Sequence, residues 1–135
     1  MTIEDSAPLA LSLTVLPGVF AICHLPEGEG TPVWLPAAGF RASIYSPGEL
    51  TIVCEQSYVP KGVKSEAGWR AIEVQGPLDF SLVGVLASLA LPLAEAGVSI
   101  FALSTYATDY VLVQENSLEK ALEALRGVGH AFLIR

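Results

Sequence analysis

Basic residues are scarce in this sequence. The 135 residues include seven lysines and arginines against fourteen aspartates and glutamates, which gives a formal net charge of −7. Binding to nucleic acid or to an anionic membrane needs a stripe of basic side chains that displaces counterions. The seven basic residues are instead scattered between Arg41 and Arg135. We therefore expect neither a nucleic-acid partner nor a membrane partner.

Long apolar runs are missing as well. The longest, Phe80 to Ala94, contains two serines and a proline and has 15 residues, whereas a spanning helix needs about 20. The N-terminal residues Met1 to Asp5 lack the basic region with which a signal peptide begins. These two absences predict a cytoplasmic protein.

Cysteine and histidine are too few to suggest a metal centre. Cys23 and Cys54 each lie in an apolar, strand-like run. They could in principle pair, but a reducing compartment and the lack of a CxxC motif favour two buried free thiols. The two histidines, His24 and His130, give no zinc-ligand spacing with them. Because the glycines also form neither GxGxxG nor a P-loop, we predict no metal and no cofactor.

Charge is low for a chain that folds alone. Hydrophobic residues make up 52% of the sequence and charged residues 16%, against about 25% charged in ordinary domains. This composition supplies ample apolar area for an ordered core. It leaves little charge to cover the surface of a monomer, so we expect a homodimer.

The C-terminal half has a regular pattern of elements. A strand at Arg70–Gln75 is followed by a helix for which Asp79 is the expected N-cap and Gly97 the expected end. Four leucines at helical spacing form its predicted inner stripe: Leu82, Leu86, Leu89 and Leu93. Strands at Val98–Leu103 and Asp109–Gln114, a helix from Ser117 to Gly127 and a strand at Gly129–Ile134 complete the pattern. The order β-α-β-β-α-β predicts an α+β, ferredoxin-like fold.

The N-terminal half is predicted to be richer in strands. Alternation from Leu9 to Val15 and the run Val19 to Leu25 indicate two strands, and Ser46–Glu49 joins two more in a hairpin. The polar stretch Gln56–Gly68 is expected to link the halves. A weak echo of Ile52–Ser57 at Leu112–Ser117, sixty residues later, suggests two related modules.

Three blocks of the C-terminal half resemble the ACT-domain family: Gly76–Gly84, Ala96–Phe101 and Ser104–Tyr110. More narrowly, the chain is similar to small tandem-ACT proteins of bacteria, which are related to the ACT domains of aspartate kinase and to the CASTOR-type arginine sensors of animals. The resemblance implies two βαββαβ modules side by side. These would be a degenerate N-terminal module at residues 1–62 and an ACT domain at residues 69–135.

The resemblance also implies an amino-acid site. Carried over by motif, its positions are Leu78, Asp79, Thr105, Tyr106, Thr108 and Asp109. Phe80 stands where the arginine sensors have an acidic residue, which puts arginine itself in doubt as the ligand. The implied role is that of a non-enzymatic sensor that binds a small amino acid or similar metabolite and acts on a regulated protein partner. The alternative is an ACT scaffold without a ligand that mediates protein–protein contacts.

The residues themselves leave these roles open. Asp79 could hold an α-amino group or serve only as a helix cap, and Asp109 could be an ordinary turn residue. If strands Arg70–Gln75 and Val98–Leu103 are parallel neighbours, the loops that follow them meet at one sheet edge. No histidine is at a readable spacing from Ser104 or Thr105, so we expect no hydrolytic activity.

Overall fold

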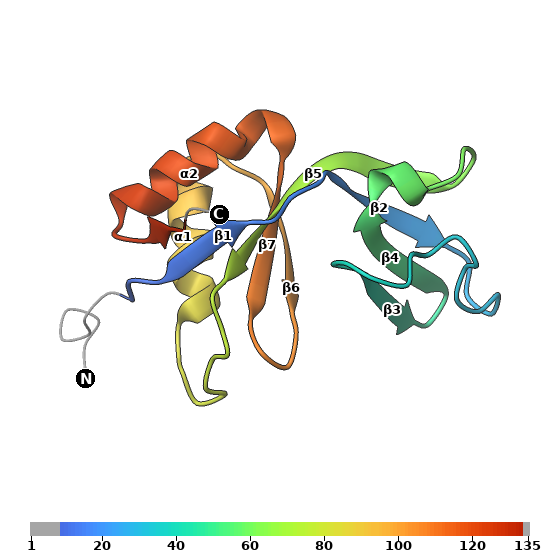
Figure 1. The fold of residues 1–135 in the computed structure, drawn as a ribbon, viewed down its shortest axis with the longest axis horizontal. Helices are drawn as coiled ribbons and strands as arrows, with labels where there is room; N and C mark the ends of the chain where they lie inside the picture. Colours follow the sequence, from blue (N-terminus) through green and yellow to red (C-terminus); the bar gives the residue numbers. More distant parts are fainter. Residues whose placement is uncertain (1–8, 134–135) are drawn as a thin grey trace. The chain divides into compact units, whose positions relative to one another are not determined.

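The computed structural model describes residues 9–133, and Figure 1 shows the arrangement of their strands and helices. Two compact units are present: Gly18–Trp69 form one, and residues up to Pro17 together with those from Arg70 onward form the other. Strand β5 (Lys64–Val74) contributes its first residues to the former and its last to the latter. We call the unit that contains Arg70–Val74 unit 1 and the other unit 2.

Unit 1 is a sheet covered by two helices. Its strands lie in the order β6-β7-β5-β1-β8, with β6 at Ile100–Ser104, β7 at Asp109–Gln114, β1 at Ser12–Val15 and β8 at Ala131–Phe132. Helices α1 (Val85–Glu95) and α2 (Leu118–Gly127) pack on one face. The core between the two layers combines side chains from the strands and both helices: Leu13, Ile72, Val74, Val111, Val113, Leu89, Leu93 and Leu125. From β5 onward the order is β-α-β-β-α-β, which confirms the predicted α+β, ferredoxin-like plan.

Helix α1 begins later than predicted. Its N-cap is Gly84, whose φ of 88° lies in the left-handed region, and Leu82 and Val83 are exposed. The helix therefore buries Val85, Leu89 and Leu93 rather than a stripe starting at Leu82. The prediction that Asp79 caps the helix is wrong, because a left-handed residue cannot continue an α-helix.

The strand after α1 is not the neighbour of β5 on which the expected meeting of the two loops is based. β6 pairs with β7, and β7 in turn pairs with β5, so β6 is not a neighbour of β5. Its residues are half-buried or exposed and none is fully buried, as on a strand with one covered face. The predicted bounds of β7 and of helix α2 are confirmed. The last predicted strand is shortened to Ala131–Phe132, and Ile134 lies outside the described residues.

Strand β1 places part of the N-terminal half in unit 1. It pairs antiparallel with β5, with Leu13 opposite Val74, and parallel with β8. The predicted modules were 1–62 and 69–135, whereas β1 belongs to unit 1 and residues 63–69 belong to unit 2. The sequence does not indicate that β1 pairs with β8, because the two strands are more than a hundred residues apart.

Unit 2 is built from antiparallel strands in the order β3-β4-β2-β5. β2 spans Phe20–Leu25, β3 Ala42–Ser46 and β4 Glu49–Glu55. The predicted hairpin is confirmed, but the predicted link Gln56–Gly68 is only partly irregular, because β5 begins at Lys64. Cys23 and Cys54 are buried free thiols in its core, as predicted.

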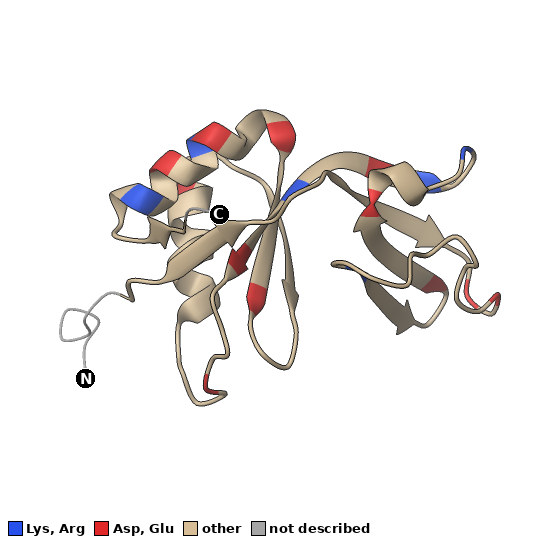
Figure 2. Cartoon of the chain, viewed as in Figure 1, with Lys and Arg blue, Asp and Glu red and all other residues tan. Residues whose placement is uncertain are grey.

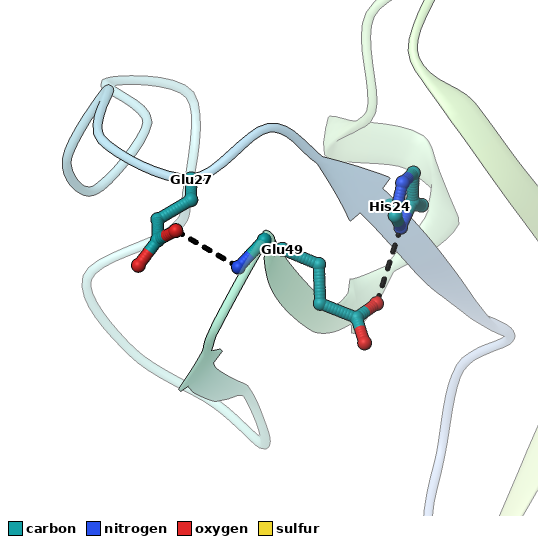
Figure 3. A network of polar contacts seen from close by, with 4 residues as sticks. His24, Glu27 and Glu49 are labelled. Atoms are coloured by element: carbon teal, nitrogen blue, oxygen red, sulfur yellow. Dashed lines mark hydrogen bonds and ion pairs between the residues drawn. The ribbon is translucent and has the colours of Figure 1, made fainter.

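Polar contacts fix the β3–β4 hairpin of unit 2 (Figure 3). His24 Nδ1 lies 3.2 Å from Glu49 Oε1, and the Gly48 N–H donates to Glu27 Oε1 over 2.8 Å.

Among residues 9–133, neither helix has the length and apolar content that a bilayer crossing requires.

Candidate ligand-binding cavity

Two loops of unit 1 are joined by hydrogen bonds. One connects β5 to α1, and the other is the turn between β6 and β7, at the same end of unit 1 in Figure 1. The Leu78 N–H donates to Ala107 O over 2.8 Å, and Thr108 Oγ1 donates to Val74 O over 2.7 Å. A Cβ on Gly76 would lie 3.0 Å from Ala107 O, closer than side chains normally come. Glycine at position 76 therefore lets the loops meet.

The hydroxyls of the second loop are used to shape the turn. Thr105 N donates to Thr108 O over 2.8 Å, and Thr105 Oγ1 accepts from the N–H groups of Ala107 and Thr108 at 3.3 Å. Thr108 is buried, with its hydroxyl engaged by β5. Both predicted site threonines thus hold the loop, and a ligand would meet them through other atoms.

All six predicted site residues line one cavity of about 280 Å³. The juxtaposition is as predicted, although the reason differs: β7, not β6, is the strand paired with β5. Residues that sequence reasoning did not assign to the site complete the lining: Phe80, Leu82, Gly84, Val85, Leu86 and Ala107. The sequence feature that could have indicated these residues is Gly84, because a glycine in the left-handed region ends the loop and starts the helix here.

The two carboxylates of the cavity are each oriented by a serine. Asp79 Oδ1 accepts from the N–H and the hydroxyl of Ser81, at 2.8 and 2.7 Å. The Ser81 hydroxyl, followed by its N–H, lowers the pKa of Asp79 below the ordinary value. Ser104 Oγ donates to Asp109 Oδ1 over 2.6 Å. Within the described part of the chain, the protein donates hydrogen bonds only to Oδ1 of Asp79 and of Asp109, so the second oxygen of each is available to a ligand.

The cavity is anionic and its mouth is apolar. Its lining includes Asp79 and Asp109 and no lysine, arginine or histidine, and Figure 2 shows acidic but no basic colour on these two loops. Phe80 and Tyr106, 75% and 85% exposed, meet edge to face with ring centroids 4.8 Å apart. This arrangement suits a ligand that brings a positive charge and an apolar part.

The start of α1 adds hydrogen-bond donors to the same place. Gly84, Val85 and Leu86 line the cavity, and the first N–H groups of any α-helix lack partners within the helix. An anionic group can be received at such an end, while the carboxylates receive a cation.

Among residues 9–133 no group of three or more His, Cys, Asp or Glu side chains is arranged to hold a metal ion.

A family model for the ACT domain matches residues 64–127. This segment of the chain is an ACT domain. The matched segment runs from the first residue of β5 to the last of α2, so it contains both cavity loops. Strands β1 and β8, which complete the sheet around this ACT domain, lie outside the match.

Relatives and solved structures agree with this assignment. A crystal structure of a protein from Agrobacterium tumefaciens is 34% identical, with a TM-score of 0.88 over 94% of this chain and 95% of that one. The human cytosolic arginine sensor for mTORC1 subunit 1 is 37% identical over an alignment of 135 positions that covers 93% of this chain and 41% of the sensor. The regulatory subunit of aspartate kinase from Thermus thermophilus, 12% identical with a TM-score of 0.63, shares the fold over 89% of this chain and 99% of that one. The chain spans 41% of the length of the curated arginine sensors that it matches.

Proposed function

We propose that this ACT protein is a non-enzymatic regulatory protein that binds a small amino acid or a similar metabolite in the cavity of unit 1. The observation that carries the proposal is the meeting of Asp79 and Asp109, thirty residues apart, around one cavity. The positions are those that the ACT resemblance implies. A relative that is named as an arginine sensor supports amino acids as the class to test.

The cavity has the size and the groups for a small zwitterion. At about 280 Å³ it is near the lower end of ligand pockets, which hold about 300–1,000 Å³. The free carboxylate oxygens would accept from an ammonium group, and the first N–H groups of α1 would donate to a carboxylate. Leu82 and Leu86 offer apolar contact to a side chain.

Chemistry on the ligand has little support. Ser104, the serine nearest to Asp109, donates its hydroxyl to that carboxylate. No histidine lines the cavity to act as a base within the described residues. We therefore infer that ligand binding changes assembly or contact with a regulated protein partner in the cytoplasm, with the homodimer as the assembled form.

A ligand-free scaffold is the second candidate. The observation that favours it is that each aspartate already gives one oxygen to a local serine. On this view, the exposed residues Phe80 and Tyr106 would serve protein–protein contact rather than ligand contact.

A thermal-shift screen against the twenty amino acids separates the two candidates. A ligand at one hundred times its dissociation constant adds about 2.7 kcal/mol to the free energy of unfolding, so the midpoint rises by several degrees. A rise with one amino acid or a few chemically related ones supports the sensor. No rise at 10 mM with any of the twenty supports the scaffold.

A further inference from the structure

A second cavity of unit 1, of about 340 Å³, adjoins the one described above. It shares five lining residues with the first cavity: Leu78, Asp79, Phe80, Tyr106 and Ala107. A residue that lines two cavities lies between them. These five residues therefore form a partition between the two cavities.

The partition is closed by a main-chain contact and a side-chain contact. The main chains of the two loops are joined by the hydrogen bond from the Leu78 N–H to Ala107 O, over 2.8 Å. The side chains of Phe80 and Tyr106 meet edge to face, with ring centroids 4.8 Å apart. One ring comes from the loop between β5 and α1 and the other from the turn between β6 and β7. We call this pair of rings the aromatic bridge.

Both rings are carried by turns that are closed by main-chain hydrogen bonds. Around the first ring, the Leu82 N–H donates to Asp79 O over 3.0 Å. Around the second, the Thr105 N–H donates to Thr108 O over 2.8 Å. These bonds fix the backbone on either side of the bridge. The rings themselves are mostly exposed, so a substitution of either ring should leave the fold intact.

The two cavities offer different groups to a ligand. Asp109 and the start of α1 at Gly84 belong to the lining of the first cavity. The ammonium and the carboxylate of an amino acid therefore find their partners there. Among the described residues that line the second cavity, Asp79 is the one with a charge, and the others include Pro77, Leu78 and the two rings. The second cavity is thus suited to an apolar chain.

We propose that the aromatic bridge limits the length of the ligand side chain that the site accepts. This inference rests on the proposed function, because it places the charged groups of an amino acid in the first cavity. With the bridge closed, that cavity of about 280 Å³ has room for a short side chain. A longer side chain has to pass between Phe80 and Tyr106 to reach the second cavity. These two residues therefore determine specificity.

Isothermal titration with straight-chain amino acids tests the bridge. The series is alanine, 2-aminobutyrate, norvaline and norleucine, and the measure is the Kd of alanine divided by that of norleucine. This ratio is insensitive to a loss of wall contact that weakens all ligands alike. In the wild type, affinity should stop rising once the chain reaches the rings. In Phe80→Ala and in Tyr106→Ala the ratio should rise at least about tenfold, because each further methylene that is buried gains about fourfold in affinity.

Two further variants separate a bridge from two independent wall residues. Tyr58→Ala removes an exposed ring of unit 2 and should leave the ratio as in the wild type. Because loss of either ring opens the bridge, the change in the double variant should be smaller than the product of the two single changes. A double variant that equals this product would overturn the bridge.

The inference and the proposed function fail in different ways. If the wild type binds the series and both single variants keep its ratio, the bridge is overturned and amino-acid binding stands. If neither the wild type nor the variants bind any member of the series, the bridge is likewise overturned. If the wild type binds none of the twenty amino acids either, the proposed function is overturned with it.

Discussion

At the scale of single residues, the candidate site depends on two aspartates that are each half engaged. Ser81 and Ser104 take one oxygen of Asp79 and Asp109 respectively. A serine hydroxyl that donates to a carboxylate fixes its rotamer, and the second oxygen remains open to the cavity. Orientation by a neighbour is useful in a binding site, because a side chain that is already fixed loses less conformational entropy when a ligand binds.

The Asp109→Asn variant tests whether this oxygen binds a ligand ammonium. Asparagine keeps a carbonyl oxygen for the Ser104 hydroxyl, so the fold should persist. Loss of a charge-assisted bond costs about 1.5–3 kcal/mol, which is roughly a ten- to hundredfold loss of affinity. Isothermal titration with the amino acid found in the screen measures the change.

The exposed Glu123 on α2 gives a matched control, since Glu123→Gln removes the same charge away from the cavity. The control should bind as the wild type does. Equal affinity of Asp109→Asn and wild type, with an intact circular dichroism spectrum, would place the ligand elsewhere.

The thiols of unit 2 should be inert. Burial raises the pKa of Cys23 to about 11, with a smaller contribution from Cys54, and burial followed by Glu55 raises the pKa of Cys54. At pH 8 a pKa two units above the ordinary value leaves roughly a hundredfold less thiolate. Labelling with an aromatic disulfide reagent should accordingly be very slow in the native protein and fast in 8 M urea. Rapid labelling of the native protein would contradict this expectation.

At the scale of elements, α1 and α2 differ in how well the sequence predicts them. Helix α2 has an apolar side, a charged side and a clear start and end at Ser117 and Gly127. Helix α1 is apolar nearly all round, so its pattern does not indicate which face is buried or where it starts. The misplaced start follows from this, since a helix that begins after Asp79 includes Gly84 as an interior residue.

The Gly84→Ala variant tests the observed start of α1. Alanine at a φ of 88° should cost about 1–2 kcal/mol in the free energy of unfolding, because its Cβ disfavours the left-handed region. No neighbour other than Leu9, at 4.0 Å, would meet the new Cβ, so the cost is conformational. Urea unfolding measures it.

Gly127→Ala in α2 is the matched control. Gly127 is the last helical residue, and its φ is not positive. A Cβ added at this position would meet no atom within 4 Å. Alanine there should leave stability unchanged or raise it by up to about 1 kcal/mol. If both variants behave alike, Gly84 is not held in the left-handed region.

Strand pairing is the part of the fold that the sequence does not reveal. The apolar run at Val98–Leu103 indicates a strand, but periodicity does not say whether it is central or at an edge. The positions of Asp79 and Asp109 could be predicted together because the family motifs mark both loops. The two loops are joined by the hydrogen bonds from Thr108 to Val74 and from Leu78 to Ala107. These bonds depend on the pairing of β7 with β5, which no local pattern encodes.

At the scale of the whole molecule, unit 1 needs β1. Leu13 is fully buried in its core, and loss of a buried leucine alone costs about 2–5 kcal/mol, a large part of an ordinary domain's 5–15 kcal/mol. A chain of residues 70–133 should therefore be unfolded, as judged by circular dichroism.

Joining residues 9–16 to residues 71–133 should restore the fold. The Leu16 N–H donates to Ala71 O over 2.9 Å, and Val15 lies opposite Ile72 in an antiparallel pair, so an Asn-Gly turn between Leu16 and Ala71 would close a two-residue hairpin. This shortened chain should show cooperative urea unfolding. If it is as unfolded as residues 70–133, unit 1 also depends on unit 2.

The assembly of the protein is the remaining prediction at this scale. Leu91, on the outer side of α1, is 62% exposed. Because only 16% of the residues are charged, few charged side chains are available to surround such an exposed apolar residue. Light scattering should give twice 14.2 kDa, and Leu91→Lys should shift the protein toward monomer. Val128→Lys, at an exposed residue after α2, should leave the dimer intact. A wild-type monomer at 100 µM would contradict the homodimer.

The pairing of β1 with β8 has a consequence for biosynthesis. β1 leaves the ribosome before unit 2, whereas its partner β8 follows both helices. At about 5–20 residues per second, the roughly 115 residues between them take about 6–23 seconds to translate. During this interval unit 2 can fold and β1 can pair with β5, but the other edge of β1 stays unpaired. The synthesis of β8, rather than the emergence of the helices, thus sets the moment at which the sheet of unit 1 is complete.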